Sequence, residues 1–173
     1  SQGTFYFYAI VSSTGTGCGS ASSNVATIIV DTDPTVSSQP LVSQTLCQGA
    51  TPQSLQVSAT GGNGIFSYQW FSNTINSNSG GTLISGATTD TYLPPTTIVG
   101  TLYYYCLINQ STLGCSVTSA TAAVIVNAAP TIINQPVSST VCLGGTPTVL
   151  SVTYANGVGI PSYQWYSNSV NSN

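Results

Sequence analysis

The chain has 173 residues, no lysine, arginine or histidine, and only three acidic residues, which give a net charge of −3. Binding to nucleic acid or to an anionic membrane surface draws its affinity from cationic side chains, so this composition excludes both. It also excludes any nucleophilic mechanism or metal site that depends on histidine.

The rest of the composition favours strands and a buried core. Hydrophobic residues make up 41% of the chain, with ten Tyr, four Phe and two Trp, which distinguishes it from a disordered polar tract. Strong helix formers are scarce, because Met, Lys and Arg are absent, and β-branched residues are abundant. The sequence therefore predicts an all-β fold. No apolar run reaches the roughly 18 residues of a membrane-spanning helix, so no membrane insertion is expected.

The first predicted strand, GTFYFYA at 3–9, has a near copy in GTLYYYC at 100–106. Other landmarks recur at nearly the same spacing of 95 to 97 residues. They are Cys18 with Cys115, Gln39-Pro40 with Gln135-Pro136, Cys47 with Cys142, and Trp70 with Trp165. A period of about 96 residues has the size of one small domain, so the chain is interpreted as a tandem array.

Two short linkers that contain proline, VDTDPT at 30–35 and VNAAPT at 126–131, mark the predicted boundaries. They divide the chain into the C-terminal part of one unit (1–32), a complete unit (33–128) and the N-terminal part of a third (129–173). Short linkers limit bending, which predicts a semi-rigid rod. No signal peptide is visible and the sequence opens within a predicted strand, so we interpret it as a segment of something longer.

Within the complete unit, short predicted strands alternate with turns, as in a β-sandwich. In chain order they are SLQVSAT (54–60), FSYQWFS (66–72), a glycine-rich turn NSNSGGT (76–82), TYLPPT (91–96), TLYYYCLI (101–108), a turn around STLG (111–114) and TAAVIV (121–126). Leu55, Val57 and Ala59 are expected on one face of their strand, and Phe66, Tyr68 and Trp70 or their alternates on the inner face of theirs. The two prolines of TYLPPT predict a strand end or an edge.

These motifs resemble the immunoglobulin-like (Ig-like) sandwich. The resemblance implies that Trp70 is the tryptophan of strand C, and that Tyr104, two residues before Cys106, is the tyrosine corner. The sequence is also similar to the Ig-like repeats of giant secreted surface proteins of Bacteroidetes, many of which are exported by type IX secretion. The shared motifs are Cys47 with Gly49, Tyr68 to Trp70, Gly100 to Tyr105, and Gly114 with Cys115. This resemblance implies a cell-surface adhesin, stalk or filament protein.

Five cysteines in a chain of this secreted type predict disulfides. The positions of Cys47 and Cys115 are kept in the neighbouring copies, whereas Cys106 is replaced by Ala9. A bridge needs both of its ends, so we predict Cys47–Cys115, with Cys106 a buried thiol; Cys47–Cys106 is the competing pair. A bridge that closes about 70 residues contributes on the order of 4 kcal/mol. Cys18 and Cys142 are expected to lack partners within the sequence.

Nothing in the sequence indicates catalysis. Asp31 and Asp33 could hold calcium between units, but the equivalent linker VNAAPT has no acid, so we interpret them as solvated linker residues. Asp90 is expected to be a turn former. The run Tyr103–Tyr105 could stack on sugars, but core packing is the simpler interpretation. We expect no enzyme activity, no cofactor and no metal site.

The leading functional hypothesis is a structural repeat segment of a long extracellular stalk, fibre or adhesin at the bacterial cell surface. Its partners would be neighbouring repeats of the same chain, with possible lateral self-association, because low net charge removes a barrier to association. One alternative is a glycan- or protein-binding Ig-like module. Another is a subunit of a filament in which one copy donates a strand to the next.

Overall fold

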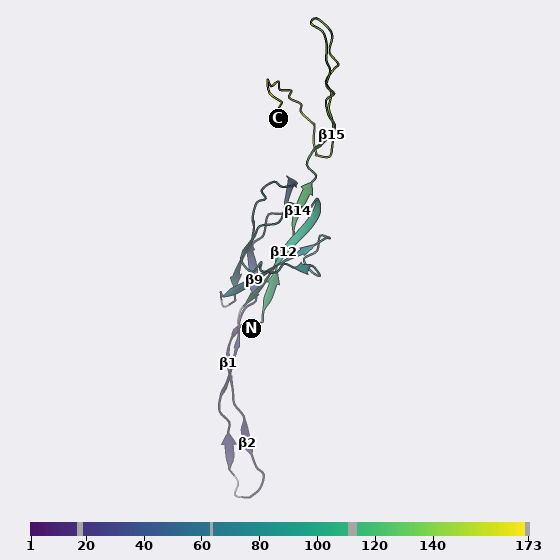
Figure 1. Ribbon diagram of the computed structural model, residues 1–173. Coiled ribbons are helices and arrows are strands. Elements are labelled where there is room, and N and C mark those ends of the chain that lie inside the picture. The colour runs from purple at the N-terminus through teal and green to yellow at the C-terminus, as the bar shows by residue number, and fades with distance from the viewer. Residues whose placement is uncertain (17–18, 63, 111–113, 172–173) are drawn as a thin grey trace.

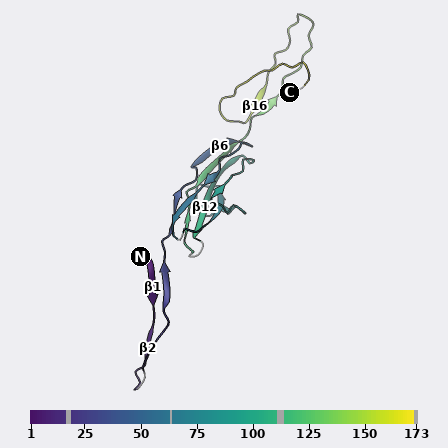
Figure 2. The same cartoon turned by 90° about the vertical axis from the view of Figure 1, so that its left-hand side faces the viewer.

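The computed structural model describes residues 1–16, 19–62, 64–110 and 114–171. The regular elements among these residues are all β-strands, so the predicted all-β fold is confirmed. None of the described residues belongs to a helix that could cross a membrane. The molecule is elongated: a central unit, residues 34–127, lies between an N-terminal ribbon, residues 3–30, and a C-terminal segment, residues 131–171 (Figure 1; Figure 2).

The larger layer of the central unit is a six-stranded sheet. Its strands, in spatial order, are β10 (Thr82–Leu83), β9 (Phe66–Asn73), β12 (Gly100–Gln110), β14 (Ala122–Asn127) and β6 (Ser43–Cys47), with β13 (Ser116–Thr118) also paired to β12. The pairs β10–β9, β9–β12, β12–β14 and β12–β13 are antiparallel. In contrast, β6 runs parallel to β14.

Four short strands form the facing layer. β5 (Pro34–Ser38) pairs with β8 (Ser58–Gly61), and β7 (Leu55–Gln56) pairs with β11 (Thr91–Tyr92), both antiparallel. β7 and β8 are consecutive parts of one extended stretch. β11 ends before Pro94, as the prolines of TYLPPT predict.

The core lies between these two layers. It joins Leu55 and Val57 from the smaller layer to Trp70, Cys106 and Val124 from the larger sheet. The inward positions predicted for 54–60 and 66–72 are confirmed, because Leu55 and Val57 are fully buried and Ala59, Phe66 and Tyr68 pack against the same cluster. These faces follow from the two-residue period of strands.

The chain crosses from one layer to the other at the repeated Gln-Pro motif. β5 belongs to the smaller layer and β6 to the larger, with Gln39 and Pro40 between them. The Gln39 side-chain oxygen accepts a hydrogen bond from the Ala120 N–H at 2.8 Å, and Pro40 is buried. A proline lacks the amide donor that a continuing strand would use, so the motif ends β5. The hydrogen bond from Ala120 holds the crossing point next to the start of β14.

The last predicted strand, 121–126, is preceded by an additional strand, β13, which the sequence did not reveal. β13 and β14 are separated by residues 119–121, where the buried Ser119 hydroxyl accepts a hydrogen bond from the Cys106 N–H at 2.9 Å and donates to the Ala120 carbonyl. The Ser119 N–H also donates to the Cys106 carbonyl. The predicted turn around STLG falls mainly on residues 111–113, which lie outside the described residues.

The N-terminal ribbon repeats the last strands of the central unit. β1 (Gly3–Phe7) pairs with β4 (Ala26–Val30), and β2 (Ile10–Ser12) pairs with β3 (Ser20–Ser22). Gly3 lies opposite Val30 as Gly100 lies opposite Val126. Even the hydrogen bonds recur, because the Ala9 N–H donates to the Ser23 hydroxyl at 2.9 Å just as the Cys106 N–H donates to Ser119. These bonds use only the backbone of residue 106, which explains why alanine serves at the same place.

The C-terminal segment repeats the first strands of the unit. β15 (Thr131–Asn134) pairs with β16 (Thr153–Ala155), with Ile132 opposite Tyr154. This is the register of β5 and β8, in which Val36 lies opposite Ala59. The backbone turn that follows is also shared, because Gly61 and Asn156 both have positive φ, 84° and 61°.

Candidate functional site at the ends of the central unit

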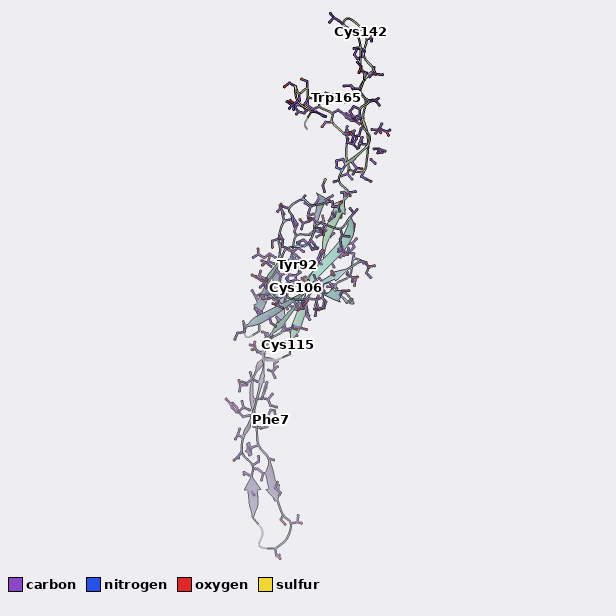
Figure 3. All side chains as sticks on the ribbon, in the orientation of Figure 1. Phe7, Tyr92, Cys106, Cys115, Cys142 and Trp165 are labelled. Atoms are coloured by element: carbon purple, nitrogen blue, oxygen red, sulfur yellow. The ribbon has the colours of Figure 1, made fainter. Side chains whose placement is uncertain are left out.

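The end of the central unit that faces the N-terminal ribbon is organised around Cys115 and the linker. Cys115 precedes β13, and its carbonyl accepts a hydrogen bond from the Gln110 N–H at 2.9 Å. Its thiol donates a hydrogen bond to the carboxylate of Asp33, in the linker between β4 and β5. This bond, with the charges of Asp33 and Asp31, raises the pKa of the Cys115 thiol. The side chain therefore lies at the joint between the ribbon and the central unit (Figure 3).

A glycine turn supports the same joint. An ideal Cβ on Gly62, whose φ is +57°, would lie 2.6 Å from the side-chain amide of Gln110. No larger residue fits there without displacing that amide, which is 2% exposed. Among the described residues, neither polar atom of this amide has a hydrogen-bond partner. Gly62 also donates its N–H to the Thr32 hydroxyl at 3.0 Å, which ties the turn to the linker.

The opposite end of the unit is organised around Cys47. Cys47 is the last residue of β6 and lies opposite Asn127, the last residue of β14. The next residue, Gln48, donates its N–H to the Asn127 carbonyl at 2.8 Å. Cys47 is exposed and lines a cavity with Pro130 of the linker and with residues of the C-terminal segment, among them Gly157.

The predicted Cys47–Cys115 bridge is not formed, and the sheet register gives the reason. Cys47 lies level with the first residue of β12, because Gly100 is opposite Val126, the neighbour of Asn127. The Cys115 carbonyl is hydrogen-bonded to Gln110, the last residue of β12. At about 3.3 Å per residue, the strand between these points spans roughly 30 Å, whereas a disulfide needs Cα atoms within about 7 Å. A bridge inside one unit is therefore ruled out.

The competing Cys47–Cys106 pair is not formed either. Cys106 lies in the middle of β12, opposite Trp70, and is fully buried, whereas Cys47 is exposed at the end of the sheet. Burial raises the pKa of the Cys106 thiol to about 11. The thiolate is the reactive form, so Cys106 is a packing residue, the buried thiol that the sequence predicts. Cys142 is exposed, and Cys18 lies outside the described residues.

Two of the three aromatic residues singled out from the sequence lie in the core, and the third is exposed. Trp70 is fully buried, donates its indole N–H to the Thr89 carbonyl at 2.9 Å and stacks on Tyr92 at 5.9 Å. Tyr104 is 2% exposed, and burial raises its pKa to about 12. Trp165, the repeat of Trp70, is 48% exposed in the C-terminal segment (Figure 3).

The run of three tyrosines does not form a sugar-stacking face. Tyr104 points into the core, whereas Tyr105 lies on the other face of the sheet, stacked on Phe71 at 5.2 Å and only 5% exposed. The Tyr105 hydroxyl accepts a hydrogen bond from the Gly81 N–H at 2.9 Å. The tyrosine hydroxyl that binds the backbone here is therefore that of Tyr105, the residue next to Tyr104, which was the predicted tyrosine corner. Strand alternation alone did not assign this role.

The three aspartates do not gather into one site. Asp31 accepts a hydrogen bond from the Thr32 N–H, Asp33 accepts the Cys115 thiol, and the carbonyl of Asp90 accepts the Val57 N–H. Within the part of the chain that the structure describes, no three His, Cys, Asp or Glu residues cluster as metal ligands would. The sequence had suggested solvated linker acids, and the contact of Asp33 with Cys115 was not foreseen because it joins residues far apart in the chain.

The strands and these end contacts define an all-β protein in which strand pairs recur along one chain. Residues 36–128 match the family described as "Domain of unknown function (DUF8696)". These residues make up more than half of the sequence, so the chain belongs to that family.

Two further comparisons complete this result. No curated protein matches the chain. A solved 3Ig structure of titin, domains I67-I69 in an E-to-A mutated variant, is similar to it with a TM-score of 0.41 and 15% identity. The similarity covers 60% of this chain and 36% of the titin chain, so the chain corresponds to about a third of that structure.

Proposed function

We propose that this chain is a segment of a tandem array of Ig-like β-sandwiches, with a period of about 96 residues, that forms a structural stalk or fibre. The units are 33–128 and its neighbours, of which 1–32 and 129–173 are parts. The observation that carries this proposal is the recurrence of register on both sides of the central unit. Gly3 with Val30 repeats Gly100 with Val126, and Ile132 with Tyr154 repeats Val36 with Ala59.

The strand order supports an Ig-like sandwich for each unit. In such domains an antiparallel sheet with strands C, F and G faces a sheet with strands A, B and E. β9, β12 and β14 correspond to C, F and G, while β5, the β7–β8 stretch and β11 correspond to A, B and E. The first strand also switches sheets at Gln39 and Pro40, so that its second half, β6, runs parallel to the last strand.

A spacing role is favoured by what the unit presents to solvent. The loop NSNSGGT (76–82) consists mainly of small and polar residues, whereas binding loops usually carry aromatic or charged anchors. We place the array outside the cell, at the bacterial surface, on the resemblance to secreted surface repeats. A net charge of −3 leaves little repulsion between parallel rods, which favours lateral association.

Electron microscopy of the native protein tests this function. We expect an unbranched rod with nodules at a regular spacing on the order of 40 Å, set by an eleven-residue strand and a linker. A variant with eight Gly-Ser residues inserted after Ala128 should bend at that joint, while the same insertion at the exposed Gly86 should leave the rod straight. Nodules without a common axis in the native protein would contradict the proposal. Dissociation in denaturant into separate short chains would instead identify a strand-donation filament.

A further inference from the structure

The two cysteine positions that recur along the chain lie at opposite ends of the unit, and each faces a neighbouring unit. Cys47 and its repeat Cys142 occupy one position, and Cys115 and its repeat Cys18 the other. Cys47 lies beside Asn127 and the linker to the C-terminal segment, whereas Cys115 contacts Asp33 in the linker to the N-terminal ribbon. Every joint in the proposed array is therefore approached by one cysteine position from each side.

The register of the ribbon shows which position of a preceding unit lies near Cys115. Val30 in β4 takes the place of Val126 in β14, so Asp31 takes the place of Asn127. Cys47 lies opposite Asn127. In the proposed array, a cysteine at the Cys47 position of the preceding unit would therefore lie opposite Asp31. Asp31 is two residues from Asp33, which holds the Cys115 thiol, and both carboxylates act on the pKa of that thiol.

The joint between the central unit and the C-terminal segment brings together the same two cysteine positions. The cavity beside Cys47 is lined by Pro130 and Gly157, which are the repeats of Pro34 and Gly62. In the central unit each of these two residues adjoins a residue that contacts Cys115. Pro34 follows Asp33, and Gly62 lies against Gln110, whose N–H binds the Cys115 carbonyl. Cys47 therefore lies beside the part of the next unit where the cysteine at the Cys115 position belongs.

We propose that the cysteine at the Cys47 position of each unit forms a disulfide with the cysteine at the Cys115 position of the following unit. This inference rests on the proposed array. The two thiols lose two protons and two electrons as the S–S bond forms, and one molecule of a disulfide oxidant, small or protein, takes them up and becomes two thiols. Cys106 remains a thiol in the core. The arrangement accounts for two recurring cysteine positions that are too far apart to pair within a unit.

Peptide mapping of the native array without reduction tests the cross-link. Free thiols are first alkylated, and chymotrypsin or pepsin is used because the chain has no trypsin sites. We expect the Cys115 peptide to be joined to the peptide of the preceding unit that carries its Cys47-position cysteine. A peptide that joins Cys47 to Cys115 of the same unit, or native Cys115 that is fully alkylated, would overturn the proposal.

A single substitution separates the two possible geometries. In Cys47→Ser, the thiol released for alkylation should be the Cys115-position cysteine of the following unit, while Cys115 of the same unit stays oxidised. Release of Cys115 itself would overturn the proposal. Cys106→Ala is the matched control and should change neither bridge. Rods that persist in the micrographs while no cross-linked peptide is found would refute the disulfide alone, whereas the absence of rods would refute the array.

Discussion

Trp70 and Trp165 occupy the same place in the repeat but differ in their surroundings. Trp70 lies in the core cluster, stacks on Tyr92 and is fully buried, whereas Trp165 is 48% exposed. The pair thus offers a comparison in which the residue type and the local motif, Tyr-Gln-Trp, are held constant. The cost of removing each side chain reports how much of the packing depends on the strands that cover it.

We predict that Trp70→Ala lowers the free energy of unfolding by about 3–5 kcal/mol, because it leaves a large cavity in the core. Trp165→Ala should change it by less than about 1 kcal/mol. Urea denaturation followed by circular dichroism measures both. Equal losses in the two variants would mean that the C-terminal segment packs more tightly than its exposure indicates.

Cys106 makes the stability of the central unit dependent on pH. Burial raises its pKa from 9.0 to about 11, so the folded state holds the proton more tightly than the unfolded state. Its contribution is fully present below pH 9 and is lost as the pH rises toward 11. Buried Tyr104, with a pKa raised to about 12, extends the same trend to higher pH.

We expect Cys106→Ala to remove about 2 kcal/mol of the fall in the free energy of unfolding between pH 9 and pH 11, and the fall that remains above pH 10 to belong to Tyr104. The variant should fold, since Ala9 takes the same place in the ribbon with the same backbone hydrogen bonds. Urea titrations at pH 8, 9, 10 and 11 measure the slope. A slope that Cys106→Ala leaves unchanged would assign the loss to other groups.

At the scale of strands, the contact of β9, β10 and β12 around Gly81 is close enough to test. An ideal Cβ on Gly81 would lie 2.7 Å from the Ser72 carbonyl oxygen and 2.9 Å from the Tyr105 hydroxyl. Gly81→Ala should therefore destabilise the protein by about 1–3 kcal/mol. Gly19→Ala is the control, because no atom lies within 4 Å of its ideal Cβ. Thermal unfolding compares the two variants. Equal melting temperatures would show that β10 can shift to make room for the methyl group without a loss of stability.

Sequence patterns predicted the strands with local signals and missed those set by distant contacts. Alternation located the inward faces of β7 and β9, since burial of every second residue is a property of one strand. The parallel pairing of β6 with β14 was not predicted, because it depends on where the chain crosses between layers. The break at Ser119 between β13 and β14 was missed for the same reason, since a single serine hydroxyl bound to the Cys106 backbone creates it.

The error about the disulfide has the same origin. Recurrence in the sequence identified Cys47 and Cys115 as the positions that the repeat keeps, but recurrence does not say in which unit a partner lies. Only the register, which places Cys47 beside Asn127 and Cys115 beside Gln110, shows that the two are at opposite ends. In a repeat protein, two kept positions can meet across a joint as readily as within a unit.

At the scale of the whole molecule, cross-links between consecutive units would overlap. Each link runs from the Cys47 position of one unit to the Cys115 position of the next. In that next unit, the following link begins at the Cys47 position, which precedes the Cys115 position along the chain, so the two links overlap. The shortest covalent path therefore includes only the 27 residues from the Cys115 position to the Cys142 position for every two units. Figure 3 places Cys115 at the ribbon-facing end of the central unit and Cys142 at the far end of the C-terminal segment, so the residues between them already extend along both parts.

This path predicts how the array responds to force. In the reduced array, each unit that unfolds should release on the order of 300 Å of chain, from about 96 residues at up to 3.6 Å each. In the oxidised array, the 27 residues between links can extend to less than roughly 100 Å for every two units. Most of that length already runs along the rod before force is applied, so little chain remains to be released. Single-molecule pulling on the native protein, with and without reductant, measures the difference. Steps of the same length in both states would show that the joints carry no covalent link, and that the rod holds its shape through its linkers and end contacts alone.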